Sequence, residues 1–74
     1  MDQAAADVAI KACLREIRDR ATQVGAASDI ALLCADKGNI AQAVEICLGI
    51  EQPLYEASRL LDAASLLNRL SRSE

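Results

Sequence analysis

The sequence predicts an all-α fold, specifically a small four-helix antiparallel bundle of helical hairpins in a single domain over residues 1–74. The chain is 53% hydrophobic but has a single aromatic residue, so its core must consist of aliphatic side chains and cysteine. Such a composition suits closely packed helices better than sheets. Apolar residues recur at helical intervals and never in the alternating pattern of a strand. The glycines and the proline fall where helices are expected to end or begin.

The first predicted helix covers about residues 4–24, and a short second helix covers about 29–36. On the first helix, Ile10, Ile17 and Val24 belong to one apolar face, while basic and acidic residues alternate on the other. Gly25 is expected to end this helix, because glycine is a common helix stop. Ser28 is expected to cap the next one.

The corner at Gly38-Asn39 is the clearest signal in the chain. Gly38 is able to adopt the left-handed conformation that closes a helix. Asn39 is a favourable N-cap, and Gln42 lies three residues later, where its side chain is able to reach back to the cap. The third helix therefore covers 40–48. Because its only charge is Glu45, we expect this helix to be central and covered on most sides.

Gly49 closes the third helix, and Pro53 opens the fourth, over about 53–70. The apolar stripe of the fourth helix is wider than one neighbouring helix needs. Two interpretations remain open: the stripe closes a small core, or part of it binds another helix. The candidate partner-binding residues are Leu60, Leu66, Leu67, Leu70 and Tyr55. For Tyr55, packing against the third helix is the alternative to a role as a recognition anchor.

Composition and charge exclude several functions. A net charge of -3 argues against nucleic acid as the partner. The longest apolar run, residues 30–35, is too short to span a membrane. The N-terminus lacks the pattern of a secretory signal, so we expect a cytoplasmic location. The three cysteines, Cys13, Cys34 and Cys47, have no histidine or CxxC partner and lie on apolar stripes. We therefore expect reduced core thiols, with no metal and no cofactor.

No constellation of residues points to catalysis. The chain has no histidine to activate a cysteine, its acidic residues are spread along the helix surfaces, and it has no glycine-rich phosphate loop. The glycines are explained by helix ends. We therefore expect a protein that is not an enzyme.

Residues Ile30 to Cys47 resemble a hairpin of the tetratricopeptide type over about one repeat. Ile30 stands at the large aliphatic position and Ala31 at the small position of the first helix, with Gly38 at the turn and Ala43 at the small position of the second helix. Ile50 departs from the pattern. The resemblance implies an adaptor or small chaperone that binds an amphipathic helix of a client. Because the stripe of the fourth helix is so wide, the partner is expected to be another protein or a second copy of the chain, as homo-oligomer or obligate hetero-complex.

The same segment is also similar to the second half of a ubiquitin-associated domain. Gly38-Asn39-Ile40, Ala43-Val44-Glu45 and Leu48-Gly49-Ile50 match the turn and third helix of that family. This resemblance implies ubiquitin binding, with Val24-Gly25-Ala26 in the place of the binding loop and Cys47-Leu48 beside it. That loop lacks the family's aromatic residue, so ubiquitin binding is the alternative function.

Overall fold

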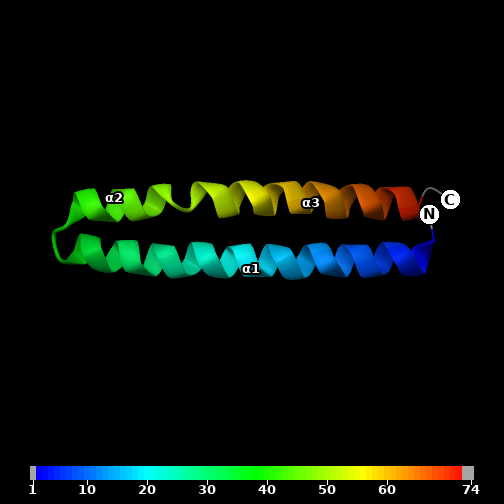
Figure 1. The fold of residues 1–74 in the computed structure, drawn as a ribbon, viewed down its shortest axis with the longest axis horizontal. Helices are drawn as coiled ribbons and strands as arrows, with labels where there is room; N and C mark the ends of the chain where they lie inside the picture. The colour runs from blue at the N-terminus through cyan, green and yellow to red at the C-terminus, as the bar shows by residue number, and fades with distance from the viewer. Residues whose placement is uncertain (1, 73–74) are drawn as a thin grey trace.

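The chain forms one long helical hairpin with two arms (Figure 1). The computed structural model describes residues 2–72. Helix α1, Gln3–Asp36, makes the first arm, and α2, Ile40–Leu48, and α3, Glu51–Arg72, follow each other along the second. The hairpin measures 56 × 14 × 12 Å. The all-α class is confirmed and residues 2–72 contain no strand, but the expected four-helix bundle is wrong.

Helix α1 continues where a break was predicted, so residues 4–24 and 29–36 belong to one helix of 34 residues. Gly25 is exposed and lies in the helix interior, where glycine costs only about 1 kcal/mol relative to alanine. Ser28 does not cap a new helix. Its hydroxyl donates to the Val24 carbonyl at 2.7 Å, one turn back in the same helix. At the true start of α1, the Asp2 carboxylate accepts from the Ala4 N–H.

The predicted corner is present and has the geometry of a Schellman motif. Gly38 has φ +85°, the left-handed conformation that glycine adopts without strain. Its N–H donates to the Ala35 carbonyl at 2.9 Å, and the Asn39 N–H donates to the Cys34 carbonyl at 2.9 Å. Asn39 is the N-cap residue of α2, as expected, but its side chain makes no capping hydrogen bond.

A short interruption separates α2 from α3 and follows from Pro53. Proline has no N–H to donate to the carbonyl four residues earlier, here Gly49, and its ring crowds that carbonyl. The chain instead makes tighter bonds, from the Gly49 N–H to the Ile46 carbonyl and from the Ile50 N–H to the Cys47 carbonyl, both at 3.1 Å. Glu51, not Pro53, is therefore the first residue of α3. Figure 1 shows α2 and α3 in line despite this interruption.

The two arms meet along a seam with a regular three-four spacing. Apart from Ala9, Ala35 and Glu56, every buried or half-buried described residue lies at this spacing. Alternation of three and four residues is the heptad pattern of coiled coils, and it continues across the α2–α3 interruption. The seam residues are Ala6, Ile10, Cys13, Ile17, Arg20, Val24, Ala27, Ala31 and Cys34 on α1, and Ala43, Ile46, Ile50, Pro53, Ala57, Leu60, Ala64, Leu67 and Ser71 on the second arm.

The seam buries little, because its best-covered residues are small. The buried described residues are Ala6, Ala31, Ala43, Ala64 and Ser71, and no large side chain among residues 2–72 is fully buried. Small residues at a helix interface let the two backbones approach closely, but each removes little apolar surface from water. The hairpin therefore leaves many of its large aliphatic side chains about half exposed.

Candidate protein interface

An open apolar groove lies between α1 and α2 near the corner. The volume of this groove is about 570 Å³. Most of its lining is aliphatic, with Ser28 and Glu51 the polar exceptions: the other residues are Ala31, Leu32, Ala35, Ile40, Ala43, Val44, Cys47 and Leu48. Ile40, Val44 and Leu48 are all exposed to solvent. Helix α2 was expected to be central and covered on most sides, and this is wrong: it lies at the tip of the hairpin and packs mainly on α1.

The groove extends into an apolar stripe along one side of the hairpin. On each arm, the residues that come directly after every second seam residue are seven positions apart. Residues at this spacing share one side of a helix. We call the members of this series between residues 14 and 61 the groove stripe: Leu14, Ala21, Ser28 and Ala35 on α1, and Ile40, Cys47, Leu54 and Leu61 on the second arm. Toward the open end of the hairpin the series continues with the polar residues Asp7 and Asn68. Ser28, Ala35, Ile40 and Cys47 line the groove itself, so the stripes of the two arms flank the same side of the seam.

The middle of the opposite edge of the seam is polar, whereas its ends carry the exposed aliphatic residues Ile30, Leu33, Leu66 and Leu70. Arg20 donates from Nε to Glu56 at 2.8 Å and from Nη1 to Glu16 at 2.6 Å. Gln52 donates to the second oxygen of Glu56 at 2.9 Å. The Gln52 amide, followed by Arg20, lowers the pKa of Glu56 below its ordinary value of 4.5. The hydrogen bonds that Arg20 donates to Glu56 and Glu16 raise the pKa of Arg20. This polar cluster therefore fixes the pairing of the arms in the middle of the hairpin, where the groove stripe is the apolar side.

The structure divides the predicted partner-binding residues into two groups. Leu60 and Leu67 are half-buried seam residues that lie against α1. Leu66, Leu70 and Tyr55 are exposed, and none of the three belongs to the groove stripe. The five predicted residues therefore do not form one surface.

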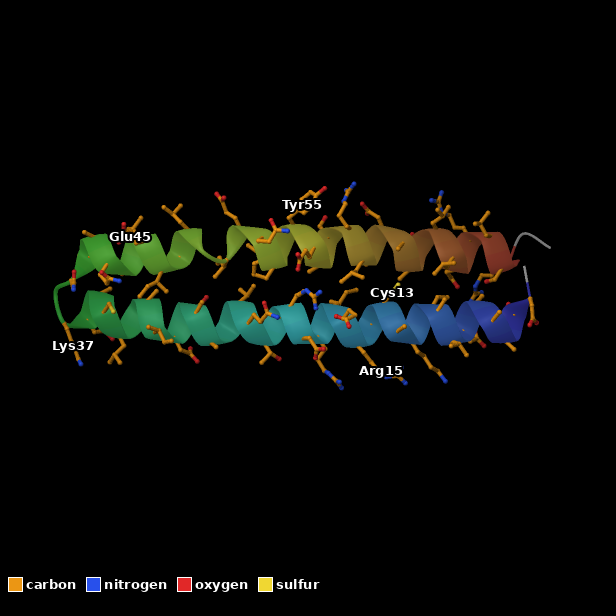
Figure 2. All side chains as sticks on the ribbon, viewed as in Figure 1. Cys13, Arg15, Lys37, Glu45 and Tyr55 are labelled. Carbon is orange, nitrogen blue, oxygen red and sulfur yellow. The ribbon has the colours of Figure 1, made fainter. Side chains whose placement is uncertain are left out.

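Tyr55 points away from α1 on the outer side of α3 (Figure 2). The Arg59 guanidinium lies 5.8 Å from its ring centroid, a cation–π arrangement. Packing of Tyr55 against the helix at 40–48, one of the two sequence interpretations, does not occur.

The cysteines have different environments, and the expectation that all three are core residues is wrong for Cys47. Cys13 and Cys34 are half-buried in the seam, and Figure 2 shows Cys13 between the arms. Cys47 is exposed in the groove. None of the three is in a disulfide.

The sequence interpretation missed the groove stripe. Leu14, Leu54 and Leu61 are exposed apolar residues that a seam of two helices does not use. A signal for them exists, because the heptad pattern of each arm has a third apolar position beside the usual two. It was hidden by the predicted helix break at Gly25, which divides the pattern on α1.

Residues 2–72 contain no cluster of three or more His, Cys, Asp or Glu side chains placed to hold a metal ion. Within the same residues, no helix has the length and apolar character needed to cross a bilayer. A scan against protein-family models and searches of curated proteins and of solved structures found no match to the chain. The residues and their geometry are therefore the basis for any proposal about function.

Proposed function

We propose that this hairpin is a non-catalytic protein–protein interaction module, an adaptor or small chaperone, that binds an amphipathic helix in its apolar groove. The observation that carries the proposal is the groove between α1 and α2, with exposed Leu32, Ile40, Val44 and Leu48 around it. A contiguous apolar patch of this kind on a small protein is typical of an interaction site. An amphipathic helix laid in a groove is a common way to cover one.

The resemblance to a tetratricopeptide hairpin supports the same function. Ala31 and Ala43, its small residues, are buried near the Gly38 turn. Ubiquitin binding has less support, because Val24-Gly25-Ala26 lies inside α1 and does not form a loop. We therefore carry the helix-binding function forward.

A site-specific photo-crosslinking experiment tests this function. A photoreactive amino acid replaces Val44 in the groove, and the matched control replaces Thr22, which is exposed on α1 and does not line the groove. In the cells that express the protein, we expect covalent protein adducts from position 44 and few from position 22. Equal adduct formation at the two positions, or none at position 44, contradicts the proposal.

A further inference from the structure

The hairpin exposes more surface than a compact protein of its mass. Its accessible surface is 5263 Å². A folded monomer of 7.9 kDa is expected to expose about 4400 Å². The excess is roughly 850 Å², and each partner in a standard protein interface buries about 800 Å². The excess surface is therefore about as large as the surface that one partner buries in a stable interface.

The two halves of the groove stripe differ in size in a complementary way. Three of the four residues on α1 are small: Ala21, Ser28 and Ala35. Three of the four on the second arm are large aliphatics: Ile40, Leu54 and Leu61. Large residues pack well against small ones that face them. A partner that presents the same halves in exchanged positions brings Ala21 against Leu54 and Ala35 against Ile40. It also brings Leu14 against Leu61, which buries two large apolar side chains together, and Ser28 against Cys47.

We propose that the occupant of the groove stripe is a second copy of this chain, stacked about a two-fold axis that runs along the hairpin. The inference rests on the proposed function and names its partner. A two-fold rotation about the long axis places α1 over the second arm of the other copy at the same height. Because Arg20 pairs with Glu56, Ala21 and Leu54 lie at nearly the same height, and Ala21 then faces Leu54 of the second copy.

Flanking residues fit this arrangement as well. The same rotation sets Leu32 opposite Val44 of the second copy near the corner, so both exposed side chains are covered. Toward the open end, Lys11 and Arg18 come opposite Ser65 and Ser58, so like charges do not face each other. All neighbouring helices in the resulting four-helix bundle are antiparallel, the usual arrangement in such bundles. The other two-fold stacking, about the short axis, also gives antiparallel neighbours, but it places α1 on α1 and the second arm on the second arm, so the half with the large residues packs against itself.

Sedimentation equilibrium over a range of concentrations tests the stoichiometry. We expect twice the 7.9 kDa chain mass at micromolar concentration. Leu61→Glu, in the groove stripe, should give a monomer, whereas Leu66→Glu, its matched control outside the stripe, should remain dimeric. Ser28→Arg should also give a monomer, because it places a large charged side chain where the second copy packs. A monomeric wild type, or a dimer dissociated by Leu66→Glu and not by Leu61→Glu, overturns the inference.

The orientation of the copies is tested by a spin label at the corner. The three cysteines are replaced by alanine, and Lys37→Cys is introduced to carry the spin label. Pulsed electron paramagnetic resonance then measures the distance between the two labels in the dimer. With the axis along the hairpin, both corners lie at the same end, and we expect a distance well below half of the 56 Å length. A distance close to that full length shows the short-axis stacking and overturns the proposed arrangement.

The two proposals fail in distinguishable ways. If the wild type is monomeric and position 44 still crosslinks to another protein, the second copy is the wrong occupant and the helix-binding function stands. If position 44 gives no adduct, neither to its own copy nor to another chain, both proposals are wrong.

Discussion

Arg20 and Glu56, 36 residues apart in the sequence, meet across the seam at 2.8 Å. Arg20 is a seam residue on α1, where a coiled coil usually has an apolar side chain. Both charged groups remain partly exposed, with 25% and 40% of their side chains accessible. A polar residue at a seam position is a common device for fixing register. This pair therefore defines which residues of the two arms lie opposite each other.

The stability of the hairpin should depend on pH through Glu56. Its pKa in the folded chain is lowered by the Gln52 amide and by Arg20. The stabilisation is therefore present above the ordinary value of 4.5 and decreases as the pH falls through the lowered pKa. We expect the thermal midpoint to fall with acidification below this value, and to fall less in Glu56→Gln. Added salt should weaken the effect. Identical pH profiles for wild type and Glu56→Gln would contradict this role.

Two glycines should respond in opposite directions to alanine. Gly25→Ala should raise the free energy of unfolding by about 0.5–1 kcal/mol, because alanine favours helix and a Cβ meets nothing within 4 Å. Gly38→Ala should lower it by about 1–2 kcal/mol, because φ there is +85°. Chemical denaturation of both variants measures the difference, and a stabilising Gly38→Ala would exclude the left-handed corner.

The sequence predicted the corner at Gly38 and the bounds of the helix at 40–48, because strong local signals specify both. It did not predict the continuity of α1. Gly25 and Ser28 are weak breakers on an exposed face, and contacts along the seam on both sides of them outweigh the local preference. The site was predicted on the wrong residues for a related reason. Leu60 and Leu67 lie in the seam, whereas Leu54 and Leu61 lie in the groove stripe. This difference becomes visible only when the antiparallel register of the two arms is known.

Substitutions of the small seam residues should reveal how closely the two arms approach each other. Ala64→Leu inserts a large side chain where the structure leaves 8% of the alanine exposed, and should cost about 1–3 kcal/mol of stability. Ala63→Leu, its exposed neighbour, should change stability by less than about 0.5 kcal/mol. Denaturant titration compares the two. Equal effects would mean that the seam tolerates large residues.

The cysteines should react with a thiol reagent in two phases. Cys47 is exposed and should be modified first in a freshly diluted monomer, whereas Cys13 and Cys34 are half-buried and should react mainly after unfolding. Mass spectrometry of partially labelled protein identifies the site. If the second copy covers the groove, raising the chain concentration should slow the reaction of Cys47 and leave the other two unchanged. Early labelling of Cys13 would contradict the seam assignment.

The interruption at Pro53 should be a local weak point. Amide hydrogen exchange should be faster at Gly49, Ile50 and Glu51 than in the middle of α3. The N–H groups of Gly49 and Ile50 donate to carbonyls only three residues earlier, and Glu51 is the first residue of α3. Pro53→Ala restores a donor for the Gly49 carbonyl and should slow exchange at these amides. If exchange is unchanged in Pro53→Ala, the interruption has another cause.

Gln3 and Arg72 lie at the same end of the hairpin, and the groove lies toward the other (Figure 1). Anything fused to either terminus, such as an affinity tag, a fluorescent protein or a surface anchor, is therefore held away from the groove along a body 56 Å long. The hairpin therefore has its attachment points at one end and its apolar groove near the other. In the proposed dimer, the termini of both copies lie at the same end. Proteins fused to these termini would therefore be held side by side.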